Sequence, residues 1–283
     1  MRTLVLLLAY DGTSQTGWTG VRDSILRPTL SRILGGEQSD LRVEAASRTD
    51  AGVHAHGQCA SLLLPESSSK ELMDAGQLAY SLNQLLPPEV AVRRAVIVDG
   101  RFDVRSNTGK RYEYRFNTAP CRDPLTRLHE WSVPTRRGQA PWDAERAAAF
   151  AAQLRGRHSF AAFGNTPRGR ERAVEVDPIC QLEEVILVPA PSKSEGEASS
   201  SWRVVVRGDR FLYKMVRNLV GAIVRVGSGE LTSDECLEAL EAGKFARSAS
   251  VPLTAPAHGL CLRRVEYAEA QDPFAEVLLD PEI

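Results

Sequence analysis

The sequence predicts an α+β protein made of two split βαβ, ferredoxin-like halves whose mixed or antiparallel sheets form a central cleft. The element order β-α-β-β-α-β can be traced through the first hundred residues, and a similar order follows. A chain of 283 residues also exceeds the size at which one core usually splits into two. We expect an N-terminal half at 1–107, a C-terminal half at 108–268 and an acidic tail at 269–283.

The elements of the first half follow from apolar patterning and from the turn residues that bound each segment. We expect a buried strand, a helix that stops at Gly35-Gly36, two strands separated by a polar segment, an amphipathic helix and a closing strand. The expected ranges are 3–9, 24–34, 41–47, 58–64, 69–86 and 89–98, with the polar segment at 48–57.

The second half opens with a strand at 110–117, where Tyr112, Tyr114 and Phe116 alternate with charged residues and predict one exposed face. Thr232 and Glu235 have the spacing of a capping box at the start of an inserted helix. The other expected elements are helices at 142–154, 211–226 and 233–242, strands around 174–188 and at 202–206 and 259–267, and a flexible loop at 191–201.

The composition is that of an ordinary globular protein, with 43% hydrophobic and 25% charged residues, and it excludes disorder for most of the chain. The apolar run 4–9 is too short to cross a bilayer. No signal or transit peptide is recognisable at the N-terminus, so we expect a cytoplasmic protein, or an organellar one if a targeting segment is missing. Five widely spaced cysteines without a C-x-x-C pair favour a reducing compartment.

The net charge of −1 is unevenly distributed. The last 19 residues carry six acidic and no basic side chains, so the rest of the chain is at +5. Between Gly100 and Arg172 there are 15 Lys or Arg against 7 Asp or Glu. This basic band, from Arg101 to Arg172, suits a nucleic-acid backbone, but an ordinary solvated surface explains it equally well on composition alone.

The segment Arg48-Thr49-Asp50-Ala51-Gly52-Val53-His54 is the most informative in the chain. It places an arginine and a carboxylate in a polar loop between two apolar strands, where functional groups are commonly displayed. Residue types alone also allow a simple turn in which Gly52 supplies a positive φ.

The full string resembles the catalytic motif of the TruA-type tRNA pseudouridine synthases. Further segments agree with that family in order along the chain, over roughly 4–267. They are Tyr10-Asp11-Gly12 with Gly17-Trp18, Phe102-Asp103-Val104-Arg105, Lys110 to Tyr114, Phe211 to Gly221, and Ala255 to Leu260. The resemblance implies the pseudouridine synthase fold and the isomerisation of uridine to pseudouridine in tRNA, in the anticodon arm around positions 38–40.

The resemblance also assigns roles to individual residues. Asp50 matches the essential aspartate, and Arg217 is the residue supplied as its ion-pair partner. Tyr112 matches the tyrosine that stacks on the target base and helps to deprotonate its ring carbon, although an ordinary core aromatic is an open alternative. Arg48 would fill the gap left by a flipped nucleotide. The other expected RNA contacts are Thr49, His54, Arg105, Arg111 and Lys214.

No cofactor or metal is expected, tRNA is the expected partner, and the resemblance implies a homodimer. The sequence departs from the family at Gln15 and Thr19, where an aromatic residue and a glutamine are usual, and at Ser24 to Pro28, where a glutamine is usual. These departures concern the RNA contacts and the choice of uridine rather than the chemistry.

Three alternative functions were weighed. The closely spaced His54, His56 and Cys59 suggest zinc, but a fourth ligand is not apparent. The segment 5–13 resembles the opening of haloacid-dehalogenase phosphatases, but Ala9 stands where the nucleophilic aspartate is needed. A catalytically silent RNA-binding module is the third, and Asp50 argues against it because a pure binder has no use for a carboxylate facing phosphates. Neither a P-loop nor a dinucleotide-binding glycine motif is found.

Overall fold

The chain is divided into two compact units in the computed structural model, which describes residues 1–35, 37–64, 74–134, 140–166, 176–190, 200–246 and 253–275. The first unit contains Met1–Gly109 and the described residues from Leu262 onward, and the second is Lys110–Cys261. The predicted α+β class is confirmed. The last strand begins in the second unit and continues in the first, whereas the sequence-based boundaries assigned all of 108–268 to one half.

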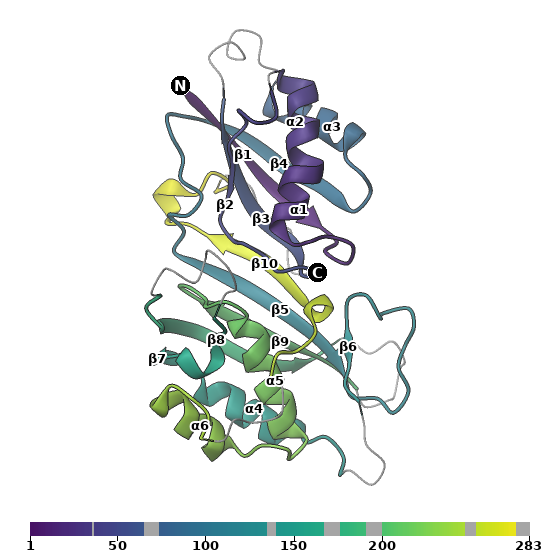
Figure 1. Cartoon of the computed structure of the whole chain (residues 1–283), viewed down its shortest axis with the longest axis vertical. Coiled ribbons are helices and arrows are strands. Elements are labelled where there is room, and N and C mark those ends of the chain that lie inside the picture. The colour runs from purple at the N-terminus through teal and green to yellow at the C-terminus, as the bar shows by residue number, and fades with distance from the viewer. Residues whose placement is uncertain are drawn as a thin grey trace. The chain divides into compact units, whose positions relative to one another are not determined.

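The first unit has the predicted order β-α-β-β-α-β. Its central strand β1 pairs antiparallel with β3 on one side and β4 on the other, and β2 pairs antiparallel with β3. Helices α2 and α3 contact each other over this sheet (Figure 1). The elements are β1 Arg2–Tyr10, α1 Trp18–Gly20, a π-helical turn Val21–Leu26, α2 Arg27–Leu34, β2 Val43–Ala45, β3 His54–Leu63, α3 Ala75–Leu85 and β4 Val90–Asp99.

The first helix begins six residues before the predicted start at Ser24. Gly17 adopts a φ of 77°, and the backbone N–H of Trp18 donates to the carbonyl of Thr49 at 3.1 Å. This tertiary hydrogen bond satisfies a donor at the helix start that no local capping side chain serves. The early start therefore depends on a segment some thirty residues away, which the local sequence pattern does not contain.

Pro28 explains why this helix widens in its middle. Proline has no N–H to donate to the carbonyl four residues earlier, and its ring crowds that carbonyl. The N–H of Arg27 bonds instead to the carbonyl of Arg22, a five-residue step, and Thr29 uses its hydroxyl to reach the carbonyl of Ile25 at 2.8 Å. A π-helical turn is a usual response to such an interruption.

The strand β3 also begins earlier than predicted. It starts at His54 rather than Gln58 because Ala55 pairs with Tyr10 across an irregularity in the β1–β3 register. The polar segment expected at 48–57 is thereby reduced to a loop of six residues, Arg48–Val53, while the strand predicted before it is shorter than expected, Val43–Ala45.

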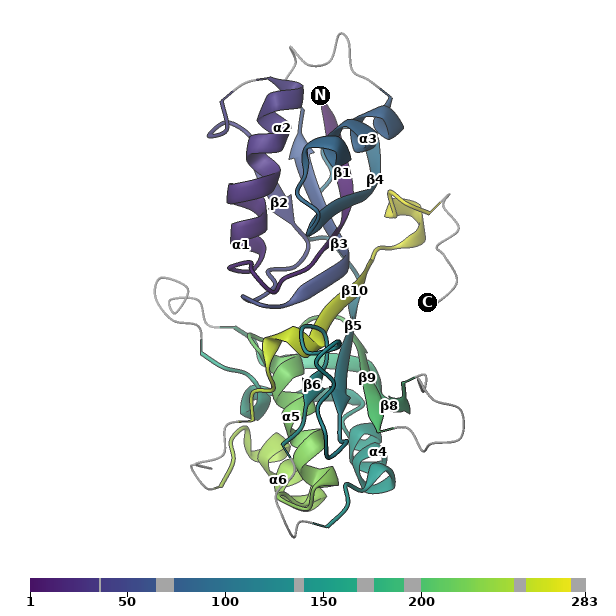
Figure 2. The same cartoon turned by 90° about the vertical axis from the view of Figure 1, so that its right-hand side faces the viewer.

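The second unit contains a four-stranded sheet in the order β5-β9-β8-β7, with antiparallel neighbours. The short strand β6 pairs parallel with β5. Helix α4 packs beside α5 and against β8, and Figure 2 shows these elements in the lower part of the view. The elements are β5 Gly109–Asn117, β6 Trp131–Ser132, α4 Ala144–Gln153, β7 Gly156–Ser159, β8 Ile179–Pro189, β9 Ser201–Gly208, α5 Met215–Gly227 and α6 Ser233–Ala242. The strand β10, Leu260–Glu266, is the one divided between the two units.

The predicted capping box of α6 is confirmed, since Thr232 and Glu235 exchange side chain–backbone hydrogen bonds. Two other expectations for this unit were wrong. Glu113 on the charged face of β5 is buried, because Arg115 and Arg203 cover it at 2.7 and 3.5 Å. Helix α5 begins at Met215 rather than Phe211, because the residue before it, Lys214, has a left-handed φ of 59° that cannot continue a helix backwards.

The described part of the acidic tail, residues 269–275, is mostly exposed, with Phe274 as its one buried residue. Just before the tail, Tyr267 donates its hydroxyl to the carbonyl of Val104 at 2.8 Å, and its ring lies 5.3 Å from that of Phe102. Four expectations concern residues outside the described part of the chain: the tail at 276–283, the flexible loop at 191–199, the helix start at 69–73 and the strand start at 174–175.

All five cysteines are free thiols. Burial raises the pKa of Cys59 and Cys236 to about 12 and that of Cys180 to about 11, whereas Cys121 is exposed. Among the described residues, no helix is both long and apolar enough to span a membrane.

We predict that a thiol reagent at pH 8 labels Cys121 rapidly in the folded protein and leaves Cys59, Cys180 and Cys236 unmodified. With pKa values of about 11 to 12, only about one in 10³ to 10⁴ of the buried thiols is ionised at that pH. Mass spectrometry of peptides labelled before and after denaturation checks this. Equal labelling of Cys59 and Cys121 in the native protein would contradict the buried assignment.

Candidate active site

The loop between β2 and β3 presents Asp50 at the start of a tight turn. The N–H of Val53 donates to the carbonyl of Asp50 at 3.1 Å, and Gly52 has a φ of 80°. A positive φ at the third position of a turn is the conformation that glycine adopts at least cost. The turn expected from Gly52 is therefore present, and it leaves Asp50 half-buried while the neighbouring Arg48 is exposed.

This loop is locked backbone to backbone against the loop that follows β1. Besides the Trp18–Thr49 hydrogen bond, the N–H of Gly52 donates to the carbonyl of Gln15 at 3.3 Å. A Cβ atom at Gly12 would run into the backbone of Val53, and one at Gly17 into the carbonyl of Thr49. The two glycines thus permit an approach that any side chain would prevent.

A buried polar cluster lies beneath the loop. The hydroxyls of Tyr10 and Thr49 are 2.7 Å apart, and the Gln58 amide contacts the Tyr10 hydroxyl at 3.3 Å and the backbone of Ser47. Thr49, predicted as an RNA contact, is only 8% exposed and uses its hydroxyl within this cluster.

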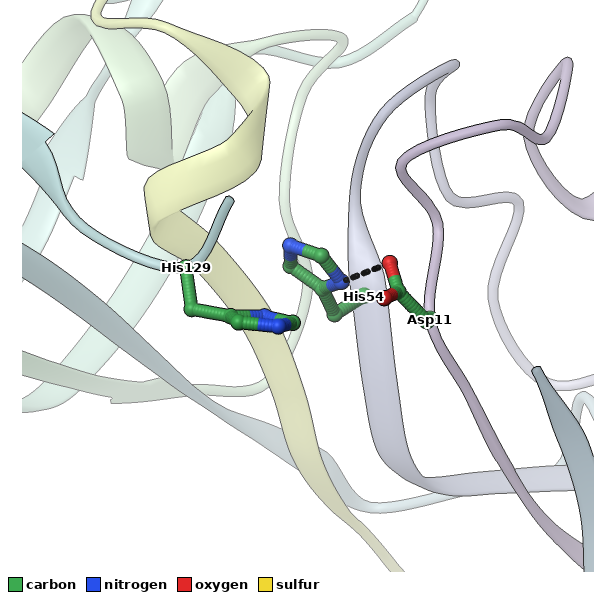
Figure 3. A group of neighbouring side chains, drawn as sticks. All are labelled: Asp11, His54 and His129. Carbon is green, nitrogen blue, oxygen red and sulfur yellow. Dashed lines mark ion pairs between the residues drawn. The ribbon is translucent and has the colours of Figure 1, made fainter. Parts of the chain in front are cut away.

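His54, another predicted RNA contact, is buried at the start of β3. Its Nδ1 lies 3.0 Å from the N–H of Gly12 and 3.1 Å from Oδ1 of Asp11 (Figure 3). One nitrogen serves only one of these partners at a time: without a proton Nδ1 accepts from the N–H of Gly12, and with a proton it donates to Asp11. Asp11 is itself oriented by Thr13, whose N–H and hydroxyl donate to the same Oδ1 at 2.8 and 2.6 Å.

Arg105 belongs to the segment between β4 and β5, not to the Asp50 loop. Its guanidinium pairs with Glu44 at 3.1 Å and Asp103 at 3.4 Å, and all three side chains are well exposed. The backbone N–H of Arg105 also binds Asp103, and this bond with the ion pair lowers the pKa of that carboxyl. Two carboxylates offset the positive charge that Arg105 was expected to offer to RNA.

In the second unit, Arg217 is positioned near the start of α5 by the segment before β10. Its Nε donates to the carbonyl of Ala255 at 2.7 Å, and the Ala255 N–H donates back to the Arg217 carbonyl at 3.1 Å. Gly221, one turn later, makes this possible, because a Cβ there would strike the backbone of Leu253.

The next residue, Asn218, strengthens the same connection. Its amide donates to the carbonyl of Phe163 at 2.7 Å and to the Asn165 side chain at 2.6 Å, and it accepts from the Thr254 hydroxyl at 2.6 Å. A buried amide with these partners is fully engaged, as burial requires.

Lys214 precedes α5 with the strained backbone noted above, and it is the one non-glycine residue with positive φ in the described part of the chain. Its ammonium lies 5.2 Å from the centre of the exposed Tyr213 ring. Such strain costs about 1–3 kcal/mol and is often found at functional sites.

Two tyrosines of β5 point to the buried side of the sheet with different partners. Tyr114 donates its hydroxyl to the carbonyl of Pro256 at 2.8 Å, and burial raises its pKa, so it is unsuited to act as a base. Tyr112 is 8% exposed and meets Phe211 edge to face, with ring centres 5.1 Å apart. Of the two, Tyr112 is therefore the better candidate for the active-site tyrosine.

The basic residues Lys110 and Arg111 of β5 have surroundings that are set by the neighbouring strand β9 and by burial. Arg111 lies opposite Arg207 of β9, and Arg207 forms an ion pair with Glu183. Burial lowers the pKa of Lys110, against the opposing charge of Asp209.

Two of the residues suggested for zinc, His56 and Cys59, lie in surroundings that do not favour a metal ion. The Nη1 of Arg93 donates to the backbone carbonyl of His56 at 3.1 Å and lies 3.4 Å from its ring nitrogen. The raised pKa of Cys59 keeps its thiol protonated, which opposes metal binding.

In the first unit the structure brings Arg48, Thr49, Asp50 and His54 together on one loop and its strand, and it sets Arg105 among acidic partners. In the second unit Arg217 lies in α5 and Lys214 immediately precedes that helix, while Arg111 and Tyr112 lie on β5. Sequence reasoning missed Gln58 and Asn218 as site-supporting residues. The available signal was a polar amide inside an apolar run, which patterning alone cannot distinguish from an exposed position.

Comparisons with known proteins agree with one another. A family model described as tRNA pseudouridine synthase matches residues 150–268. A protein of Myxococcus xanthus named tRNA pseudouridine synthase A is 37% identical over 275 residues, which are 95% of this chain and 93% of that protein. Proteins with the same name from Chlamydia trachomatis serovar L2b and Syntrophotalea carbinolica are 35% and 34% identical, over 94% and 95% of this chain and 92% and 97% of their own lengths.

We predict that Gly12→Ala lowers the free energy of unfolding by about 1–3 kcal/mol, because the new methyl group must displace the Val53 backbone. The matched control is Gly76→Ala at the start of α3, where a Cβ would approach only a side-chain oxygen, Oδ2 of Asp74, at 3.0 Å. Alanine is favoured over glycine in a helix, so the control should be neutral or stabilising by about 0.5–1 kcal/mol. Urea denaturation measures the free energy of unfolding of both variants. Equal midpoints would refute the close contact between the loop after β1 and the Asp50 loop.

Proposed function

Since the chain belongs to the tRNA pseudouridine synthase family, we propose that Asp50 is the carboxylate with which it isomerises uridine to pseudouridine in tRNA. The observation that carries this assignment is the placement of Asp50 at the start of a turn fixed by backbone contacts to the β1 loop. A group that reacts at a defined atom must be held within fractions of an ångström, and backbone contacts hold it better than a long side chain would.

The reaction breaks the bond between N1 of uracil and C1′ of ribose and forms a bond from C5 to C1′. The proton on C5 is lost, and N1 acquires a proton, so reactant and product are isomers and no redox partner or cofactor is consumed. Asp50 in its ionised form attacks or assists at the glycosidic bond while the detached uracil turns. Its half-buried position combines access for the substrate with partial exclusion of water.

The roles of Tyr112 and Arg217 are part of the same proposal and rest on the family resemblance. Tyr112 stacks on the target base and assists removal of the C5 proton. The edge-to-face contact of its ring with Phe211 supports this role, because the contact restricts the orientation of the tyrosine ring. Arg217 serves as the cation that favours ionised Asp50. Its anchoring to Ala255 through Nε supports this role, since it restricts the guanidinium.

The target nucleotide must leave the helical stack before this chemistry begins, at a cost of a few kcal/mol. We propose that the exposed Arg48, two residues before Asp50, occupies the space it leaves. Of the other RNA contacts, Lys214 and Arg111 retain this role in the proposal. Thr49, His54 and Arg105 are supported less, because each has the protein partners described above.

The expected target lies in the anticodon arm, around positions 38–40, and the basic band Arg101–Arg172 supplies the track for the tRNA backbone.

We also propose a homodimer, on the basis of the resemblance. Sedimentation equilibrium tests this proposal because it measures the mass of the particle in solution. The departures at Gln15, Thr19 and the Pro28 region are the positions where this chain's RNA contacts should differ from those of its relatives.

We predict that Asp50→Asn lowers pseudouridine formation by about 10³-fold or more while tRNA binding is retained, since only the reacting carboxylate changes. Unmodified tRNA transcripts are incubated with enzyme, and pseudouridine is mapped by carbodiimide adducts and primer extension. The stop position identifies the target uridine in the same experiment. Asp40→Asn, at an exposed turn of the first unit, is the matched control and should keep native activity. An active Asp50→Asn would remove this residue from the mechanism.

We predict steep salt dependence of tRNA binding, because phosphate contacts release counterions. If about six phosphates are contacted, affinity falls by about 10³ between roughly 50 and 200 mM salt. Filter binding at a series of salt concentrations gives the slope of log K against log salt. A flat line would eliminate the basic band as a backbone track.

A further inference from the structure

Gln58 is a fully buried amide in a strand whose residues are mostly buried. It lies in the middle of β3 opposite Leu8, between Cys59 and the irregularity near Ala55, and its exposed fraction is 0%. A buried amide has to find partners for its N–H and carbonyl groups. The direction in which its bonds run therefore says what this residue is used for.

The side-chain hydrogen bonds of Gln58 lead toward the Asp50 loop. Its Nε2 donates to the carbonyl of Ser47 at 2.7 Å, and its Oε1 accepts from the Ser47 N–H at 3.2 Å, so one amide clamps both polar groups of that residue. Nε2 also donates to the Tyr10 hydroxyl at 3.3 Å. That hydroxyl lies 2.7 Å from Oγ1 of Thr49, the residue before Asp50.

The cluster therefore connects two neighbouring strands to the residues that lead into the turn. Gln58 comes from β3 and Tyr10 from the end of β1, and together they hold Ser47 and Thr49 from beneath. The close backbone approaches at Gly17 and Gly12 described above involve the same loop, at Thr49 and Val53. Contacts from β1, β3 and the loop after β1 thus restrain the residues on both sides of Asp50 in the sequence.

We propose that Gln58 and Tyr10 are positioning residues for the reaction, which set the place of the Asp50 carboxylate without touching the substrate. This inference rests on the proposed function of Asp50. Reaction rates are sensitive to such placement, and an error of about 1 Å can cost about 100-fold. Loss of the cluster should thus affect the chemical step more than tRNA binding.

The chain offers a control that has the same hydrogen-bond pattern, on Asn83, which is exposed whereas Gln58 is fully buried. Asn83 of α3 clamps Val92 of β4 in the way that Gln58 clamps Ser47, donating from Nδ2 to the carbonyl and accepting from the N–H, both at 2.8 Å. Asn83 lies in the same unit, and its two bonds end on β4 rather than on the loop. Removing it tests what the loss of one amide clamp does to stability alone.

The experiment measures single-turnover pseudouridine formation with enzyme in excess over tRNA, together with tRNA affinity and thermal melting. The variants are Tyr10→Phe, which keeps the ring and removes only the hydroxyl, Gln58→Met, which keeps the volume, Asn83→Ala and Asp50→Asn. We expect Tyr10→Phe and Gln58→Met to lose about 10- to 100-fold in rate with affinity within about twofold of native. Asn83→Ala should lose thermal stability and keep its rate.

Native rates in both Tyr10→Phe and Gln58→Met, with Asp50→Asn inactive, would overturn this inference and leave the proposed function in place. A rate loss in Asn83→Ala as large as that in Gln58→Met would also overturn it, because the loss would then follow stability rather than position. Full activity in Asp50→Asn would instead defeat the proposed function itself. Tyr10→Phe keeps the core volume, so it reports on the clamp even if Gln58→Met fails to fold.

Discussion

The close approach of two loop backbones, residues 12–18 and 47–54, is the constraint on which the candidate site depends. It exists because Gly12 and Gly17 have no side chain where Val53 and Thr49 pass. Once the loops are in contact, their N–H and carbonyl groups can pair, as Trp18 does with Thr49 and Gly52 with Gln15. The start of α1, the turn at Asp50 and the surroundings of His54 all follow from this one contact.

The second unit uses the same physical arrangement for Arg217. Gly221 lets the segment ending at Ala255 lie against α5, and hydrogen bonds from Arg217 and Asn218 then hold it there. In both units a glycine permits the approach and polar groups fix its geometry. Such an arrangement suits a site whose functional side chains must be immobile, because the residues that hold them belong to helices or strands or are hydrogen-bonded to them.

Positive charge is less freely available than the amino-acid counts indicate. Arg105 and Arg115 each have a carboxylate within ion-pair distance inside their own unit, so part of the basic band is offset locally. Exposed ion pairs contribute at most about 1 kcal/mol each, and an RNA phosphate can compete for such arginines. The electrostatic field of this part of the chain is therefore a property of the arrangement of charges rather than of their number.

The sequence by itself determined the class of fold, the order of elements in the first unit, the capping box of α6 and the glycine-dependent turn after Asp50. These features are encoded locally, in apolar periodicity, helix caps and residues such as Gly52 that select a backbone conformation. The motif around Asp50 also allowed the family to be identified, which the comparisons confirm.

Only the tertiary structure decided which polar residues support the site. Gln58 reads in the sequence as one polar residue in a strand, and its role appears only when Ser47 and Tyr10 are beside it. The helix start at Trp18 and the burial of Glu113 were missed for the same reason, because their partners Thr49 and Arg203 are distant in the chain. Hydrogen bonds between distant segments leave no local pattern, so neither periodicity nor propensity could have predicted them.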